Sequence, residues 1–360
     1  QGLRSRLKAL CFKPSIENIR IPEGKTIEEI WSIFNLIFSQ LQQCDEIVFD
    51  ITHSFRSIPM LVMVILNYAK VVRNVSLRGI YYGAMESLGN LSEVQRMPVS
   101  ERIVPVFDLS AFDELLDWAT AIERFLESGD GTMVYRLTGK KAKLIRKTKK
   151  AQDDGADAMA RIASAIENFN GAISTCRGKI INHSIETLKD SIKMAKSTEI
   201  SPALVPLLEQ LEDRLQVFSG HAVEDGLKAV EWCLEHYLVQ QGYTILREFM
   251  ISQVCAWLEV DPYDFDQRER IEGLIKHDVK MWQKEQDRKS RVKVTLDIQE
   301  PPYEIFRQKP ELLVMFSKIL PLRNDINHAG IRKDPKPPRT LKHELDQLVS
   351  QMKKVILVNC

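Results

Sequence analysis

Apolar positions in the first 110 residues alternate between helical and strand-like spacing. A capping box opens a run with apolar residues at helical intervals, which predicts a helix over residues 26–43. The short run 46–51 is rich in β-branched and aromatic residues, so we expect a strand buried on both faces. A second helix is predicted to begin near Pro59 and to be apolar nearly all round, and another strand follows at 75–84.

This order of elements predicts a Rossmann-like α/β domain. With the apolar stretch 104–109 it indicates a parallel sheet with right-handed crossovers. Ligands of such sheets bind at the carboxyl ends of the strands, so we expect the turn 50–57 and the segment 83–86 at one edge. No alternating strand pattern recurs after about residue 112, where long segments carry helical periodicity. The second half is therefore predicted to be all-α.

Composition excludes several classes of protein. The chain has 360 residues, of which 44% are hydrophobic, and 50 Lys and Arg against 49 Asp and Glu leave a net charge of +1. Two or three folded domains are expected, neither disordered nor low in complexity, and any basic surface must be local. Residues 140–158 combine a dense basic run with acidic residues and glycine. They predict an exposed, mobile connection, with an RNA-contacting strip as the alternative.

Cysteine and histidine spacing gives no metal or disulfide pattern. The six cysteines lie at least 22 residues apart, and no H-E-x-x-H motif occurs. We therefore expect no metal site, reduced thiols and a cytoplasmic location. The longest apolar stretch, 58–66, is too short to span a membrane, so no membrane partner is expected.

The segment 50–59 is the first candidate site. A strand end, a turn carrying hydroxyls, His53 and Arg56, and then a helix N-terminus could bind an anion or a nucleotide. The alternative is a capped turn in which Asp50 and Thr52 satisfy backbone amides. No P-loop or G-x-G-x-x-G motif is present, which disfavours ATPase and dehydrogenase chemistry.

The segment 320–330 is the second candidate site. Pro321 suits a helix start and Gly330 a stop, so Arg323 is predicted in a first turn, near the positive end of a short helix. Five residues rotate by about 140° along a helix, so Arg323 and His328 need the reach of arginine or a second subunit to converge. Six Lys and Arg against two acids between residues 321 and 342 indicate a local basic surface. The alternative is an Arg–His pair on a solvated helix.

Together these motifs resemble the CRISPR-associated proteins of the D-x-T-H-G motif, which join a Rossmann-like CARF sensor to a helical HEPN ribonuclease. The matches are D-I-T-H-S-F-R-S at 50–57, the later Y-Y-G-A-M-E and P-V-F-D-L-S segments, and R-N-D-I-N-H at 323–328, an R-x4-H motif. The resemblance implies a CARF domain over 1–110, a helical connector over 111–219 and a HEPN domain over 220–360. Ser54 departs from the family's glycine, and we expect the family's first strand to precede Gln1.

The resemblance also implies a function. It is that of a metal-independent endoribonuclease of type III CRISPR defence, without a cofactor, activated by a cyclic oligoadenylate, with cyclic tetra-adenylate favoured. The expected partners are single-stranded RNA and a second copy of the chain, in a homodimer or higher oligomer. The implied catalytic residues are Arg323, Asn324 and His328, and the implied ligand-binding residues are Thr52, His53, Ser54, Arg56, Ser57, Gly83 and Ala84.

Two other functions stay open at this point. A nucleotide-sensing adaptor could bind RNA or a partner without cutting it. Alternatively, the sensor domain could itself degrade its cyclic ligand.

Overall fold

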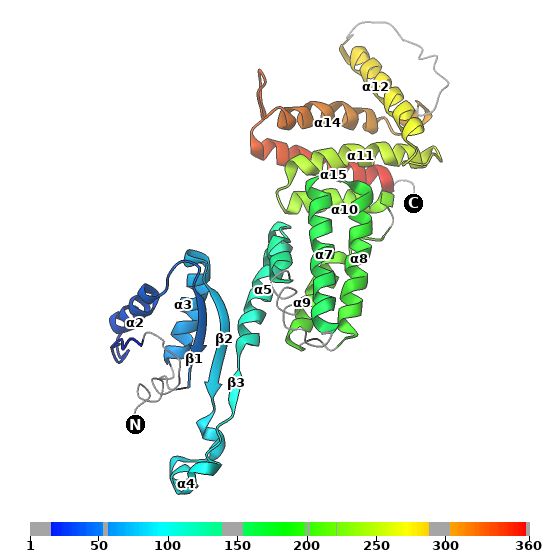
Figure 1. Ribbon diagram of the computed structural model, residues 1–360. Coiled ribbons are helices and arrows are strands. Elements are labelled where there is room, and N and C mark those ends of the chain that lie inside the picture. Colours follow the sequence, from blue (N-terminus) through cyan, green and yellow to red (C-terminus); the bar gives the residue numbers. More distant parts are fainter. Residues whose placement is uncertain are drawn as a thin grey trace. The chain divides into compact units, whose positions relative to one another are not determined.

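The computed structural model describes residues 16–52, 57–138, 154–198, 200, 202–220, 222–287 and 303–357. The chain divides into two compact units, Gln1–Glu114 and Leu115–Cys360 (Figure 1). The first contains a small sheet with helices and the second is helical in its described part. This arrangement is compatible with a Rossmann-like domain followed by a helical domain.

The first unit follows the predicted order of elements. Its main elements are α2 (Ile27–Gln40), β1 (Glu46–Asp50), α3 (Ser57–Arg73), β2 (Ser76–Gly83), α4 (Leu91–Arg96) and β3 (Val106–Asp108). The Thr26 side chain accepts a hydrogen bond from the Glu29 amide at the start of α2, so the predicted N-cap is confirmed. The helix ends at Gln40, three residues before the predicted limit.

The sheet is mixed, not parallel as predicted. The order is β1-β2-β3, with β1 parallel to β2 and β2 antiparallel to β3. Between β2 and β3 the longest described helix is α4, whose six residues rise only about 9 Å. That is too short to return the chain along the eight-residue β2, so the chain doubles back as β3.

The prediction that β1 is buried on both faces is also wrong. Its exposure alternates along the strand, and the Val48 side chain is 62% exposed. The small core of this unit is formed mainly by α2, α3 and β2, through residues such as Ile33, Ile65 and Ile80. Ring contacts between Phe38 and Tyr68, with centroids 5.2 Å apart, join α2 to α3. Over the described part of the unit, one face of β1 is therefore exposed.

The second unit begins within α5 (Ser110–Ser128) and continues as a series of helices. They are α7 (Asp154–Ser174), α8 (Gly178–Lys196), α9 (Val205–Leu215), α10 (Ala222–Glu235), α11 (Val239–Trp257), α12 (Phe265–Asp287), α13 (Tyr303–Gln308), α14 (Glu311–Asn327) and α15 (Pro338–Leu357). The long helices α7 and α8 lie side by side (Figure 1). Helix α11 contacts α10, α12, α14 and α15.

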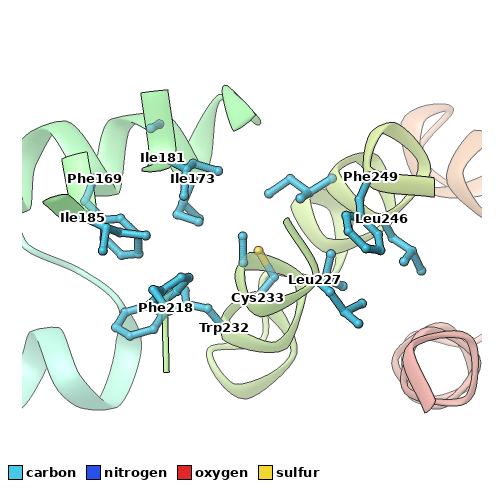
Figure 2. Close-up of a cluster of buried hydrophobic side chains, with 14 of the residues drawn as sticks. Phe169, Ile173, Ile181, Ile185, Phe218, Leu227, Trp232, Cys233, Leu246 and Phe249 are labelled. Carbon is cyan, nitrogen blue, oxygen red and sulfur yellow. The ribbon is translucent and has the colours of Figure 1, made fainter. Parts of the chain in front are cut away.

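One continuous core runs through these helices. Phe169 on α7 is fully buried, and its ring centroid lies 6.2 Å from that of Phe125 and 5.1 Å from that of Trp232. Figure 2 shows the cluster extending from Ile185 on α8 to Phe249 on α11. The core thus crosses residue 220, where the family resemblance implies a boundary between connector and HEPN domain.

Three further predictions concern particular segments. Residues 140–153 of the basic connection lie outside the described residues, and Asp154 begins α7, so residues 154–158 of the connection are helical. The described cysteines, at 44, 176, 233 and 255, are free thiols. Over the described ranges, no helix is both long and apolar enough to cross a membrane.

Candidate functional site

The two predicted sheet-edge segments meet at the carboxyl ends of β1 and β2. The Thr52 amide donates to Asp50 Oδ1 at 2.8 Å, and the Gly83 amide donates to Thr52 Oγ1 at 2.8 Å. A Cβ atom on Gly83 would lie 3.1 Å from the Thr52 side chain. Glycine at position 83 therefore permits the close approach of Thr52.

These contacts are those expected of a capped turn, the alternative interpretation of the motif. Asp50 and Thr52 both satisfy backbone amides, although a threonine hydroxyl that accepts one hydrogen bond can still donate another. Ala84 is buried, and its amide donates to Pro105 O at 3.0 Å, so it helps to join the strands. His53, Ser54 and Arg56 lie outside the described residues, as does the side chain of Ser57, the first residue of α3.

A carboxylate also stands at this edge. Tyr82 Oη donates to Glu86 Oε1 at 2.5 Å. This hydrogen bond lowers the pKa of Glu86 and raises the pKa of Tyr82, so Glu86 is ionised at neutral pH. An anion bound here must therefore be held by positive groups outside the segment 83–86.

At the second candidate site, the prediction of a helix start at Pro321 is wrong. Pro321 lies inside α14, which begins at Glu311, so Arg323 stands far from the positive N-terminal end of the helix. The helix continues through the proline because its apolar side, including Leu312, Phe316 and Ile319, is buried in the core. The α14 dipole therefore adds no positive charge for a phosphate at Arg323.

Arg323 lies against α11. Its Nε donates to Thr244 Oγ1 at 3.4 Å, and the residue is half-buried. Burial raises the pKa of the nearby Cys176 thiol, an effect that the positive charges of Arg323 and Arg177 oppose. Three chain segments, 176–177, α11 and the end of α14, therefore meet around the guanidinium.

His328 caps α14 and is exposed. Its amide donates to the Asn324 carbonyl at 3.0 Å, one turn earlier, while Asn324 itself is half-buried. The helix ends at Asn327, and the Gly330 amide, with φ of +67°, donates back to the Asp325 carbonyl at 2.9 Å. The helix therefore stops just before Gly330, as predicted, but the left-handed residue that follows the C-cap is Ala329, with φ of +54°, whose amide donates to the Ile326 carbonyl at 2.9 Å.

Arg323 and His328 occupy the same end of α14 but different surroundings. Arg323 contacts α11, whereas His328 lies at the exposed C-cap. Because they are five residues apart, Arg323 and His328 are rotated by about 140° from each other about the helix axis, as expected from the sequence. Within a single chain, no contact joins Arg323 to His328 among the described residues.

Asp325 is a residue that sequence reasoning missed. It is only 4% exposed, and its Oδ2 accepts the Lys336 amide at 2.8 Å, while no described residue bonds Oδ1. The contact ties the basic loop after the helix back to α14. The available signal was an acid inside a basic segment, two residues after Arg323 and so on another side of the helix.

Contacts from α11 were also missed. Thr244 bonds Arg323, and Gln240 Nε2 donates to Asn327 Oδ1 at 3.3 Å. Thr244 and Gln240 stand 79 and 87 positions before their partners on α14, so no local pattern could have connected them.

The basic residues of the loop are largely at the surface. Arg332, Lys333, Lys336 and Arg339 are exposed, and Lys342 Nζ lies 3.4 Å from the ring centroid of Tyr237. Arg332 also donates to the Pro321 carbonyl at 2.9 Å. Within the described ranges, no group of three or more His, Cys, Asp or Glu side chains could hold a metal ion.

Comparison with known proteins adds one relative. No protein-family profile matches the chain. The chain is 26% identical over 259 residues to the CRISPR-associated protein MJ1674 of Methanocaldococcus jannaschii. The match covers 71% of this chain and 36% of that protein, so the chain spans about a third of the length of the curated relative. Over most of its length, the chain is therefore similar to a CRISPR-associated protein.

Proposed function

We propose that the chain acts in CRISPR defence as a metal-independent endoribonuclease of single-stranded RNA, activated by a cyclic oligoadenylate. The similarity to a CRISPR-associated protein supports the defence role. The observation that carries the ribonuclease assignment is the end of α14, where Arg323, Asn324 and His328 lie next to an exposed basic loop. Arginine and histidine beside basic residues suit the cleavage of a phosphodiester.

The proposed reaction uses the ribose of the substrate as nucleophile. His328 accepts the 2′-hydroxyl proton as the 2′ oxygen bonds to phosphorus and the bond to the 5′ oxygen breaks. The leaving oxygen takes up a proton, giving a 2′,3′-cyclic phosphate and a 5′-hydroxyl. Arg323 stabilises the charge that develops on the phosphoryl oxygens, and Asn324 positions Arg323 or the phosphate.

The proposed active site is composite. Arg323 is held by Thr244 on α11, whereas His328 is exposed, so a second copy of the chain supplies the facing set. In the α/β unit the cyclic ligand binds at the edge where Thr52 meets Gly83, together with His53, Ser54, Arg56, Ser57 and Ala84. Ligand binding favours the dimer arrangement in which the two sets converge, through its higher affinity for that arrangement.

A fluorescent RNA cleavage assay tests the proposal. Wild-type protein is incubated in EDTA with cyclic tri-, tetra- or hexa-adenylate, and we expect cleavage with one ring size, tetra-adenylate. Arg323→Ala and His328→Ala should each lower the rate at least about a hundredfold while cyclic ligand still binds. Matched controls are Arg136→Ala, at an exposed arginine, and His277→Ala, at an exposed histidine of α12, which should cleave normally.

The same assay separates the alternatives. Full activity in both Arg323→Ala and His328→Ala would reject the active site, and ligand-dependent RNA binding without cleavage would indicate an adaptor. Arg56→Ala should abolish ligand-stimulated turnover, so unchanged stimulation would reject the sensor assignment. Incubation with the cyclic ligand alone, followed by a search for linear products, tests whether the sensor degrades its activator.

A further inference from the structure

A cavity of about 320 Å³ lies within the helical unit, lined by α8, α10, α11 and the chain leading into α12. Its volume falls at the lower end of the range of small-ligand sites. Its apolar part includes Ile181 from α8 and Phe249 from α11, both labelled in Figure 2. Two exposed aromatic side chains, Tyr263 and Phe265, complete the lining. Such a site suits a flat ligand with apolar faces.

One polar group of the lining lacks a partner. Asn182 is only 8% exposed, and no described residue forms a hydrogen bond with its Nδ2. Buried amide donors in proteins are almost always bonded, so this group is suited to a ligand acceptor. A purely apolar ligand would leave it unsatisfied.

Two of the charged side chains that line the cavity pair with each other, and a third is a cation without a carboxylate partner among the described residues. Arg268 donates to Glu248 Oε2 at 2.8 Å and to Ser252 Oγ at 2.9 Å, so these three groups satisfy one another. Lys179 Nζ lies 5.2 Å from the ring centroid of Tyr263, and no carboxylate of the described residues pairs with it. Lys179 stands in the first turn of α8, which holds no acidic residue. This side of the cavity therefore favours negative charge.

The cavity adjoins the proposed active site. Cys176 lines it, and the Arg323 charge acts on the Cys176 thiol. Helix α11 contributes Ile245 to the cavity and the adjacent Thr244 to the hydrogen bond with Arg323. A ligand that spans both places needs a phosphate near Arg323 and a flat group a short distance away.

We infer that this cavity binds a base of the single-stranded RNA substrate, next to the phosphate held by Arg323. The inference rests on the proposed ribonuclease function and deepens it. Unpaired bases stack on aromatic side chains and bond through their edges, which matches Tyr263, Phe265 and the Asn182 amide. Lys179 attracts the neighbouring phosphate.

Binding of fluorescent single-stranded RNA, followed by anisotropy, tests the inference. The measurement uses the full chain carrying His328→Ala, so that the proposed cleavage does not interfere, with and without cyclic tetra-adenylate. Combined Tyr263→Ala and Phe265→Ala should weaken binding about tenfold or more, because two stacking faces are lost. Tyr135→Ala, at an exposed tyrosine outside the cavity, is the control and should bind normally.

Two further variants separate a binding role from a structural one. Lys179→Ala should weaken binding and lower its salt dependence, whereas Lys193→Ala, at an exposed lysine later on α8, should not. Asn182→Ala should change the relative affinities for the four homopolymeric RNAs. A purely structural asparagine would instead change the melting temperature and leave that base preference intact.

The outcomes distinguish this inference from the ribonuclease proposal. Weaker RNA binding by the variant lacking Tyr263 and Phe265 supports the cavity as a base-binding site. It does so even if wild-type protein cleaves no RNA, in which case only the ribonuclease proposal fails. Cleavage by wild-type protein, combined with unchanged RNA affinity in all the cavity variants, overturns the cavity and leaves the ribonuclease proposal standing. If the chain with an unaltered cavity binds no RNA measurably, the inference that the cavity binds a base is overturned as well.

Discussion

The two units of the chain differ in how they bury apolar side chains. In the helical unit, the buried side chains of α7, α8, α10, α11, α14 and α15 join in one core. In the α/β unit, several large apolar side chains are exposed, among them Val71 of α3 at 86% and Val48 of β1. The helical unit thus has one extended core, whereas the α/β unit leaves one apolar face of α3 exposed.

The difference bears on the two candidate sites. Arg323 lies on α14, whose apolar side is packed in the core. Such a fixed helix is a suitable support for the proposed catalytic groups. Thr52 and Gly83 are locally fixed by hydrogen bonds, but the elements that carry them expose apolar faces suited to another surface.

The largest effect is expected at the centre of the helical core. Phe169→Ala removes a fully buried ring that contacts Phe125 and Trp232, and should lower the free energy of unfolding by about 3–5 kcal/mol. Met60→Ala, at a side chain 74% exposed on α3, should change it by less than about 0.5 kcal/mol. Amide hydrogen exchange measured by mass spectrometry reports the two units separately.

The contrast would fail in a recognisable way. A similar loss of protection in both variants would show that Met60 is covered in solution. In that case the two units would not differ in how far they bury their own apolar residues.

A smaller effect is expected where the helical unit fixes its basic loop. Asp325→Ala removes the buried carboxylate that accepts the Lys336 amide, a hydrogen bond to a charged group, and should cost about 1–3 kcal/mol. Asp325→Asn keeps an oxygen acceptor and should recover most of this loss. Thermal unfolding and RNA cleavage of both variants check the prediction. Equal loss in both would assign the effect to the negative charge of Asp325 and not to the hydrogen bond.

The pH dependence of the helical unit provides a third test. Burial lowers the pKa of His236, whose Nδ1 lies 3.0 Å from the Glu127 carbonyl. The unfolded chain therefore binds the proton more readily, so stability is full above the ordinary pKa of about 6.5 and falls as the pH drops below it. One proton limits the slope to about 1.4 kcal/mol per pH unit.

The matched variant is His236→Asn, whose amide can replace the Nδ1 donor. Chemical unfolding between pH 7 and pH 5 should show a shallower pH dependence in this variant than in the wild type. Equal slopes would mean that other groups control the acid sensitivity of the unit.

Local features of the fold were predictable from the sequence. The capping contact between Thr26 and Glu29, the strand Ser76–Gly83 and the stop at Gly330 each depend on residues only a few positions apart. The meeting of Thr52 with Gly83 also followed, because consecutive parallel strands end at one edge.

Features set by distant packing were not predictable. Pro321 obeys the rule for a helix start, but burial of the residues before it in the core extends the helix through it. The Thr244 contact with Arg323 joins residues 79 positions apart, which no local pattern connects. Each is a tertiary effect that overrides, or is invisible to, local pattern.

The smallest effect in dilute solution is expected on the exposed face of α3. Val71→Lys places a charge where the side chain is already exposed, so the stability of a single chain should change by less than about 0.5 kcal/mol. At higher protein concentration, the wild-type α/β unit should gain protection from hydrogen exchange as this apolar face is covered by a second copy. The lysine variant should lose that gain, because burying an unpaired ammonium is costly. The same concentration dependence in both proteins would mean that self-association, if it occurs, uses another surface.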